Sequence, residues 1–288
     1  MKAVFLREIK SYYTTITGFL FAAFLLLFAG IYTMAYNLSA GYPNFEYVLS
    51  AITIIYLIGV PILTMRAMAE EKKQKTDQLL YSLPLPIYKV VTGKYLALLS
   101  VLAAPVAIMC AYPLILTMFG DVYLPSAYCA IIGFFLMGAT LLAIGLFISS
   151  VTENQITSAV ICLITMLLLY FMTALSSFVP SDASSSVLAL MILAVAFAVV
   201  FYLLTHNSIV AMIVALALAG GLFAGYTFMP SAFEGLFPDM MSAISVFDRF
   251  EDFSGGVFNI AGVVYYISVT AVFLFMTVQS MEKRRYGA

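Results

Sequence analysis

Few side chains in this sequence can act as catalysts or metal ligands. The chain has one histidine, His206, and three cysteines that lie singly within apolar stretches. A structural zinc site needs several Cys or His ligands at close spacing, so we expect neither a metal centre nor a disulfide framework. The pair Gly93 and Lys94 lacks the upstream glycine of a nucleotide-binding P-loop. We therefore expect no catalytic residue, no metal and no cofactor on this chain.

The residues best suited to binding a protein partner gather in the most highly charged segment, residues 66–94. Helix-forming residues run over 68–83 and are followed by prolines, which predicts a short helix with a firm stop. Leu79, Leu80 and Leu83 form an apolar patch beyond the charges, and such a patch marks a docking surface. A solvated charge run is the alternative. The predicted contact residues are Glu70, Glu71, Lys72, Thr76, Asp77, Leu79, Leu80 and Leu83.

The composition of the chain indicates a membrane protein. Hydrophobic residues make up 64% of the 288 positions and charged residues 9%, whereas soluble domains carry about 45–50% apolar and about 25% charged residues. About 20 apolar helical residues cross a bilayer. We predict an all-α integral membrane protein with eight transmembrane helices, at 17–36, 48–65, 95–119, 128–148, 156–178, 187–204, 209–228 and 257–278. Pro105 and Pro113 predict a kink or partial break in the third span.

Charges are distributed unevenly between the predicted loops. All Lys and Arg residues except Arg249 precede the first span, lie between the second and third, or follow the eighth. Because Lys and Arg mark the cytoplasmic side, both termini are expected in the cytoplasm and the number of spans is even. This topology accounts for the basic residues, so we expect no nucleic-acid binding. The other side carries Glu46, Asp121, Asp182, Glu234, Asp239, Asp248, Glu251 and Asp252.

Two segments outside the spans have amphipathic patterns. Phe5, Ile9 and Tyr12 recur at helical spacing in the N-terminal segment, with Arg7 and Lys10 on the opposite side, which predicts an interfacial helix on the inner leaflet. The alternative is that this helix is simply the start of span one.

The second amphipathic segment, residues 230–256, interleaves aromatic residues with acids. Acids are too costly at mid-bilayer, so we expect a pair of short amphipathic or re-entrant helices in the outer interface. The segment is either a passive lid or an outer gate. The predicted gate residues are Phe247, Asp248, Arg249, Phe250, Glu251 and Phe253.

No acid, lysine or arginine falls in the middle of a predicted span. Ion-driven transporters carry ionisable residues at depth, and channels need a polar pore lining. An autonomous secondary transporter is therefore disfavoured. If the chain moves a solute, the energy comes from another polypeptide, and a lipid-like, hydrophobic or peptide cargo suits the lining best.

Seven short strings occur in order along nearly the whole chain. They are TMRAMAEEK (64–72), KTDQLL (75–80), GKY (93–95), SSVTENQI (149–156), FDRFEDF (247–253), VYY (264–266) and EKRR (282–285). Together with the two amphipathic segments, they resemble the permease subunits of type-2 ABC exporters, most closely the gliding-motility-type permeases. That family usually has six spans, so residues 179–229 are interpreted as an added hairpin within a single transmembrane domain.

The resemblance implies a role for each segment. Residues 2–15 would be the elbow helix and 70–83 the coupling helix, which sits in a groove of a separate ATP-binding subunit. Residues 230–256 would lie above the exit. A second cytoplasmic contact would be made by Thr152, Glu153, Asn154 and Gln155.

The resemblance also implies the chain's location and partners. The chain would lie in a bacterial cytoplasmic membrane and pair with a second permease, identical or different. ATP and Mg²⁺ would bind the partner subunits, and an extracytoplasmic auxiliary protein would be a further partner. The alternative function is a non-transporting component that transmits ATP-driven conformational change to an external or periplasmic protein.

Overall fold

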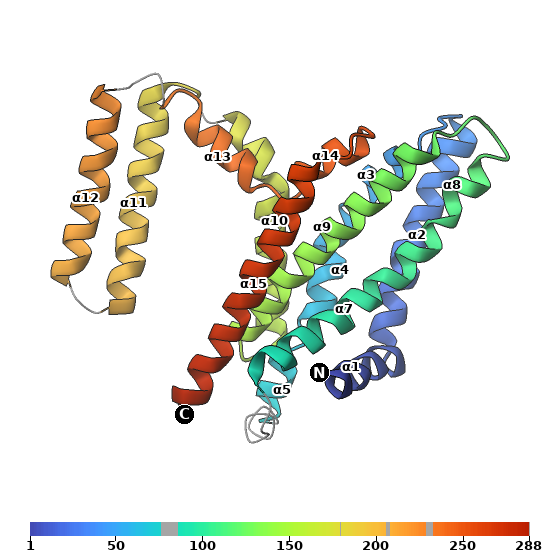
Figure 1. Ribbon diagram of the computed structural model, residues 1–288, viewed down its shortest axis with the longest axis horizontal. Helices are drawn as coiled ribbons and strands as arrows, with labels where there is room; N and C mark the ends of the chain where they lie inside the picture. The colour runs from blue at the N-terminus through green and yellow to red at the C-terminus, as the bar shows by residue number, and fades with distance from the viewer. Residues whose placement is uncertain (76–85, 179, 206–207, 229–232, 288) are drawn as a thin grey trace. The chain divides into compact units, whose positions relative to one another are not determined.

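The computed structural model describes residues 1–75, 86–178, 180–205, 208–228 and 233–287, and all regular structure among them is helical (Figure 1). The helices are α1 (Lys2–Thr14), α2 (Ile16–Tyr32), the π-helix η1 (Thr33–Ser39), α3 (Glu46–Ile52), α4 (Ile55–Thr64), α5 (Ala69–Lys73), α7 (Ile87–Met109), α8 (Ala111–Leu116), α9 (Leu124–Val151), α10 (Gln155–Phe178), α11 (Ala183–Thr205), α12 (Ser208–Phe228), α13 (Leu236–Ile244), α14 (Arg249–Ser254) and α15 (Ile260–Gly287).

Among the described residues, five helices are long and apolar enough to cross a membrane. They are Ile16–Ser39, Ile87–Leu116, Leu124–Val151, Gln155–Met172 and Ile260–Arg285. A sixth arises if the pair Glu46–Ile52 and Ile55–Lys73, bent by 57°, is one span. This is the architecture of a multi-pass helical membrane protein.

The chain forms two compact units. Unit 1 comprises residues 1–168 and 246–288, and unit 2 comprises residues 169–245. Within unit 2, α11 packs along α12 and also contacts α13. The apolar stretches Ala183–Val195 and Leu216–Phe228 in this pair are shorter than the spans of unit 1. The predicted sixth and seventh spans fall on α11 and α12.

Helix α9 forms the centre of unit 1. It packs against α15, α14, α7, α4 and α3, and most of its side chains are buried. Glycines of α9 let side chains of two neighbouring helices, α4 and α14, approach closely. A Cβ atom at Gly138 would lie 2.7 Å from the Tyr56 hydroxyl of α4, and one at Gly133 would lie 2.6 Å from Phe253 of α14. At Gly145 the nearest atom would be Thr64 Oγ1, at 2.5 Å. Small residues at such contacts are how membrane helices pack without a hydrophobic driving force.

Backbone carbonyls of α9 also accept hydrogen bonds from its neighbours. The Tyr56 hydroxyl donates to the Phe134 carbonyl at 3.1 Å, and the Tyr95 hydroxyl donates to the Ala139 carbonyl at 3.2 Å. These tyrosines lie on α4 and α7. Because lipid offers no competing water, each polar tip must find a partner inside the protein. The glycine contacts and hydrogen bonds together fix the register of both helices against α9.

The helices are interrupted at two places where the sequence predicts it. Helix α1 ends at Thr14, and the extended backbone of Thr15 separates it from α2, so the N-terminal segment is a helix of its own (Figure 1). The third span is divided at Cys110, between α7 and α8. Pro113 has no N–H to donate to the carbonyl four residues earlier, which accounts for a break at this point.

Two predicted boundaries were wrong. The third span begins at Ile87, not at residue 95, so Lys94 lies inside α7 rather than in the charged loop. The helix expected over 68–83 is interrupted after Lys73, and Lys75 adopts a left-handed backbone with φ of 56°. Residues 76–83 of this prediction lie outside the described residues. A left-handed residue just after the last helical turn ends a helix.

The close packing at Gly138 gives a stability prediction. We expect Gly138→Ala to lower the free energy of unfolding by about 1–3 kcal/mol, because the added methyl group forces Tyr56 and Leu102 apart from α9. The matched control is Gly220→Ala in α12, where an added Cβ meets nothing within 4 Å. Thermal unfolding in detergent measures both. Equal melting temperatures for the two variants would contradict the packing described.

Candidate functional site

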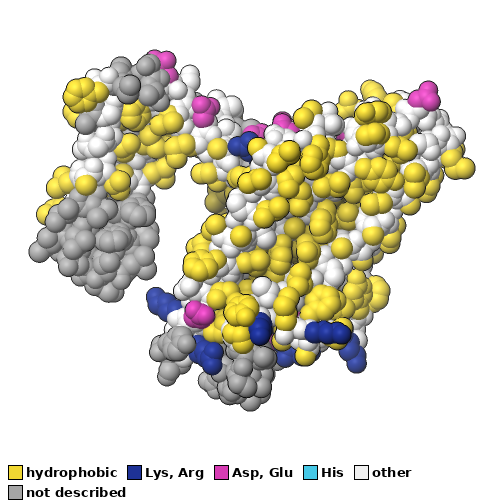
Figure 2. All heavy atoms as spheres, in the orientation of Figure 1, with side chains coloured by type: hydrophobic (Ala, Val, Ile, Leu, Met, Phe, Trp, Pro, Cys, Tyr) yellow, Lys and Arg dark blue, Asp and Glu magenta, His cyan; other side chains and the backbone are white. Residues whose placement is uncertain are grey.

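The predicted docking segment leaves unit 1 at the end where Lys and Arg side chains gather (Figure 2). Helices α1 and α5, the start of α7 and the end of α9 meet there, and both chain termini lie at the same end (Figure 1). We call the polar cluster that joins these elements the basal cluster; it consists of Arg7, Glu8, Arg66, Glu70, Glu71 and Lys94.

Lys94 of α7 is the centre of the basal cluster. Its side chain is only 2% exposed. The ammonium group lies 3.2 Å from Glu8 Oε1, 3.0 Å from Glu71 Oε1 and 2.7 Å from the Ala67 carbonyl. All three N–H donors of the lysine therefore have acceptors, as a buried charge requires. The three acceptors come from α1, from α5 and from the turn before α5.

Arg7 completes the bridge between α1 and α5 on the outer side of Lys94. Its guanidinium lies 2.8 Å from Glu8 Oε1 and 2.7 Å from Glu71 Oε1. Burial disfavours ionised Glu8, but the charges and hydrogen bonds of Lys94 and Arg7 outweigh that effect and hold the pKa of the Glu8 carboxyl below its ordinary value. Hydrogen bonding to Glu8 in turn raises the pKa of Arg7. Two cations thus share two carboxylates.

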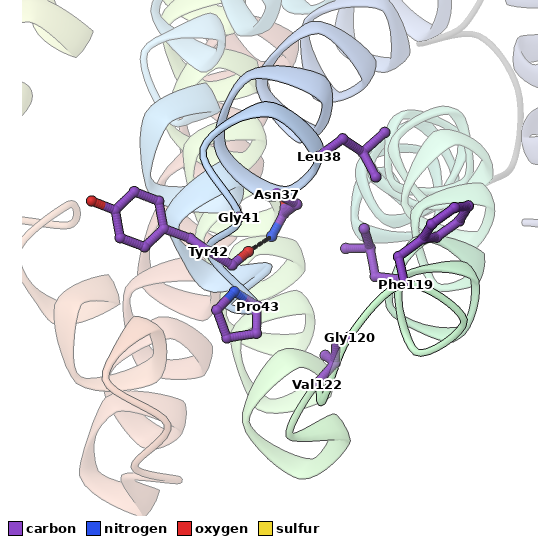
Figure 3. A pocket seen from close by; sticks show the side chains of 9 residues that line it. Asn37, Leu38, Gly41, Tyr42, Pro43, Phe119, Gly120 and Val122 are labelled. Atoms are coloured by element: carbon purple, nitrogen blue, oxygen red, sulfur yellow. Dashed lines mark hydrogen bonds between the residues drawn. The ribbon is translucent and has the colours of Figure 1, made fainter.

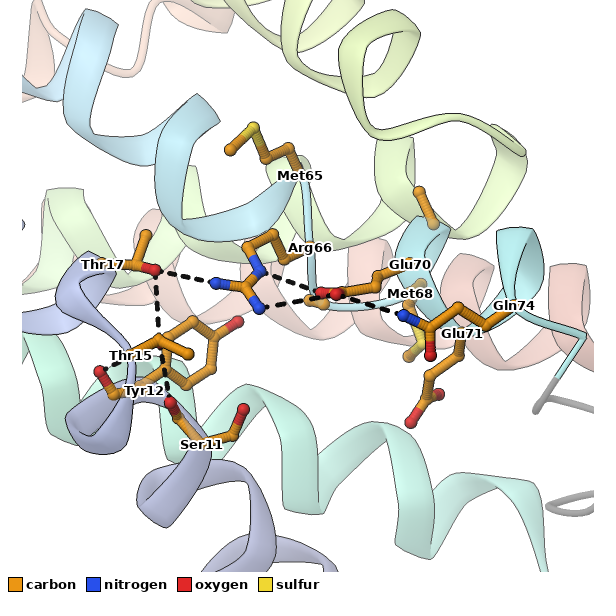
Figure 4. A network of polar contacts seen from close by, with 12 residues as sticks. Ser11, Tyr12, Thr15, Thr17, Met65, Arg66, Met68, Glu70, Glu71 and Gln74 are labelled. Carbon is orange, nitrogen blue, oxygen red and sulfur yellow. Dashed lines mark hydrogen bonds and ion pairs between the residues drawn. The ribbon is translucent and has the colours of Figure 1, made fainter.

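Arg66 ties the end of α4 to the start of α2 (Figure 4). Its guanidinium lies 2.9 Å from Glu70 Oε2 and donates to Thr17 Oγ1 at 3.0 Å. Nearby, the hydroxyl of the buried Tyr12 donates to the Leu63 carbonyl at 3.1 Å. The amphipathic helix α1 is therefore packed against the bundle by polar contacts as well as by its apolar face.

Helix α5 is capped by the end of α9. Ser149 Oγ accepts hydrogen bonds from the backbone N–H groups of Met68 and Ala69, both at 3.1 Å. In return, Lys72 Nζ donates to the Ser150 and Thr152 carbonyls. The first amides of one helix and the last carbonyls of another are the groups that helix geometry leaves unpaired. Each of these two helix ends therefore supplies hydrogen-bond partners for the unpaired backbone groups of the other.

The predicted contact residues are thus divided. Glu70, Glu71 and Lys72 make contacts within the chain, and Glu70 and Glu71 keep 30% and 20% of their side chains exposed. The other predicted contact residues lie outside those that the structure describes; they are Thr76, Asp77, Leu79, Leu80 and Leu83. His206, in the α11–α12 connection, also lies outside the described residues.

The second predicted contact, Thr152 to Gln155, is the turn between α9 and α10. Thr152 ends α9 with an extended backbone, and the Asn154 side chain accepts from the Ile156 N–H at 3.2 Å to begin α10 with Gln155. Glu153 is largely exposed and lies 2.8 Å from Arg284 of α15. The turn therefore presents a charged, solvent-facing tip directly beside α5.

The predicted external gate residues surround α14. Phe250 and Phe253 are buried, with Phe253 wedged against Gly133 of α9 and Gly262 of α15. Arg249 lies over the Tyr265 ring, 5.6 Å from its centroid. Phe247 and Asp248 are half-buried, whereas Glu251 is exposed. The buried rings of Phe250 and Phe253 therefore hold α14 against the bundle.

Several residues of the site were not predicted from the sequence. Lys94 was interpreted as one more cytoplasmic charge, and Glu8 and Ser149 were given no role. A usable signal exists for Glu8, which is the only acid in the first 45 residues. An isolated acid beside Arg7 in a basic helix indicates a specific ion pair.

The described residues contain no group of three or more metal-ligating side chains. Comparison with known proteins gives no match to any family model, curated protein or solved structure.

The buried charge of Lys94 gives a second stability prediction. We expect Lys94→Met to lower the free energy of unfolding by about 3–5 kcal/mol, because it leaves the largely covered carboxylates of Glu8 and Glu71 with only Arg7 beside them. The double variant with Glu8→Gln should recover part of the loss, since Arg7 then has only the Glu71 carboxylate to neutralise. Unfolding in detergent measures the coupling, and strictly additive losses would contradict it.

The lowered pKa of Glu8 gives a pH prediction. A carboxyl whose folded pKa is depressed stabilises the protein above its unfolded pKa, and this contribution disappears as pH falls through the folded pKa. Between about pH 5 and about pH 3, stability should therefore fall less steeply in Glu8→Gln than in the unaltered protein. Glu153→Gln, at an exposed pair, is the control that should keep the original slope.

Proposed function

We propose that the chain is the transmembrane permease subunit of a type-2 ABC exporter of the gliding-motility type. ATP hydrolysis takes place on a separate nucleotide-binding subunit, so the chain itself is not an enzyme. The energy reaches it through the segment after the second apolar helix and drives export of a hydrophobic, lipid-like or peptide cargo. The proposal rests on the sequence resemblance and on the mechanical connections of that segment.

One observation supports the proposal most directly, namely the attachment of α5. The helix is joined to α9 through Ser149 and Lys72, and to α1 and α7 through Glu71. A subunit that pushes on residues 76–85 therefore acts on three other elements at once. Such connections suit an element that receives force from a partner. A loop that is merely solvated would not need them.

The proposed topology has eight spans, with both termini in the cytoplasm of a bacterium. The basic end of unit 1 is the inner-leaflet side, in agreement with the rule that Lys and Arg stay inside. Helices α11 and α12 are the added hairpin. A second permease chain and two ATP-binding subunits complete the assembly.

A second function, transmission of movement to an external partner without transport, is favoured by α14. Phe253 packs against α9 at Gly133 and against α15 at Gly262, so motion of these long helices carries α14 with it. In this case the exposed acids Glu251 and Asp252 would face an extracytoplasmic protein. Reconstitution with the ATPase in sealed vesicles separates the two functions, because only an exporter moves cargo across the bilayer.

The coupling role gives a functional prediction. We expect the double substitution Leu79→Asp and Leu80→Asp to abolish ATP-dependent activity and co-purification of the ATPase, because charge replaces the apolar docking patch. The permease itself should keep its melting temperature. The matched control is Leu79→Met with Leu80→Met, which preserves apolar volume and should retain docking.

The decisive measurement is the amount of P-loop ATPase recovered with the affinity-purified permease from its native membrane. Undiminished recovery with the Asp pair would contradict the proposed docking site.

A further inference from the structure

The cations that α1 and α7 carry at the basic end of unit 1 fall into two groups. Arg7 and Lys94 share the carboxylates of the basal cluster. Lys2 and Lys10 of α1 and Lys89 of α7 form no ion pair with any described residue. The side chains of Lys2 and Lys10 are exposed. These cations are available to an anionic group from outside the chain.

Lys2 and Lys10 lie on one face of α1 together with two apolar side chains. Residues three or four apart are neighbours on a helix surface, so Lys2, Leu6, Lys10 and Tyr13 form a single row, which we call the basic stripe. Leu6 is 54% exposed although it lies between two lysines. Tyr12, from the apolar face that the sequence predicted, is buried against the bundle. The side of α1 that remains outside is therefore the basic stripe.

The basic stripe leads directly into the apolar surface of α2. The rings of Tyr13 and Phe19 meet edge to face with their centroids 5.4 Å apart. Ile16, Phe19 and Leu20 are 78%, 58% and 53% exposed, and they begin a helix that is long and apolar enough to cross a membrane. Exposed apolar side chains at the start of such a helix face lipid. The basic stripe is therefore continuous with a surface that acyl chains cover.

Lys89 adds a third cation where α1 crosses α7. A Cβ atom at Gly93 of α7 would lie 3.3 Å from Val4 Cβ and 3.4 Å from the Met1 carbonyl oxygen, so the first turn of α1 packs on α7 at this glycine. Lys89 precedes Gly93 by about one helical turn, and Lys2 belongs to the same first turn of α1. Positive charge from two helices is thus concentrated near one crossing.

A cavity at the opposite end of unit 1 offers no such attraction to an anion. It has a volume of about 240 Å³ and lies between η1 and the connection from α8 to α9 (Figure 3). Its lining, which includes Asn37, Tyr42 and Phe119, contains no Lys or Arg. Asp121, between two of the lining residues, is exposed, so an anionic group would meet a like charge there.

Charge and position together favour a phospholipid over a soluble partner. Lysines near a membrane surface attract anionic lipids, and an amphipathic helix adds binding energy through the apolar side chains that it inserts beside the head groups. Tyrosine is enriched at the same depth. An acidic soluble protein would account for Lys2 and Lys10, but it would not account for the exposed Leu6 or for the contact of Tyr13 with Phe19.

We propose that the basic stripe binds the head groups of anionic phospholipids. Lys2 and Lys10 are about 12 Å apart along the helix, so each ammonium group binds the phosphate of its own lipid, while Leu6 and Tyr13 contact the acyl chains. The proposal is independent of the exporter function, and the proposed orientation decides only the leaflet, which is the inner one. The lipid is defined by its chemistry, a head group of net negative charge on two acyl chains.

The test measures lipid binding to the purified full chain without any ATPase, by native mass spectrometry. Dioleoyl phosphatidylglycerol, which is anionic, is compared with dioleoyl phosphatidylcholine, which has the same acyl chains and a head group of no net charge. We expect the anionic lipid to bind about tenfold more tightly, because each lysine near the membrane surface attracts it. Equal affinities for the two lipids would overturn the proposal.

Paired substitutions locate the binding. Lys2→Gln with Lys10→Gln should remove most of the preference for the anionic lipid and leave the melting temperature unchanged, because both side chains are exposed. Lys2→Arg with Lys10→Arg keeps both charges and should keep the preference. The matched control, Lys73→Gln with Lys283→Gln, removes the same charge at exposed positions of α5 and α15 and should also keep it. A preference that survives the first pair, or an equal loss in the control, would contradict this site.

The same variants separate a lipid from a protein occupant. We expect the pair Lys2→Gln with Lys10→Gln to lose the lipid preference and to recover as much P-loop ATPase from the native membrane as the unaltered chain does. If ATPase recovery falls while the lipid preference is unchanged, the basic stripe belongs to a protein partner, and the lipid is rejected as its occupant. Because lipid binding is measured without the ATPase, failure of the exporter proposal would leave this result intact.

Discussion

The ammonium group of Lys94 imposes the strongest local constraint on this structure. A charge that is taken out of water must be matched by acceptors at short distance, and the acceptors here come from three separate elements. If helix α1 left the bundle, or if α5 shifted along α7, the Lys94 ammonium group would become exposed or would lose its acceptors. The position of the whole basic end of unit 1 therefore depends on one buried lysine, with Arg7 sharing its carboxylates.

Helix α9 connects this end to the opposite one. At one end its Ser149 accepts from α5, and near the other its Gly133 receives Phe253 of α14. Between them, Gly138 and Gly145 bring α4 into contact with the same helix. These are short contacts between rigid elements, so a displacement at α5 has a direct mechanical route to α14. This route supports both proposed functions, since each requires force to cross the bilayer within one chain.

The sequence predicted the elements of the fold better than their contacts. Hydropathy located each helix of the described residues that is long and apolar enough to cross a membrane, because burial in lipid needs only a run of apolar residues. It misplaced the start of α7, since a charge such as Lys94 looks like the end of a span until its partners are known. Those partners, Glu8 and Glu71, lie far away in the chain. The burial of Phe250 and Phe253 was missed for the same reason, because an aromatic residue suits lipid and protein equally well.

The capping of α5 by Ser149 has a consequence for how this region can be studied. A helix of five residues is far below the length that is stable alone in water. Its first amides are satisfied by a side chain of another helix, so its shape is a property of the assembled protein and not of its own sequence. A synthetic peptide covering the segment, or a graft of it onto a soluble carrier, would lose the conformation that α5 has in the protein.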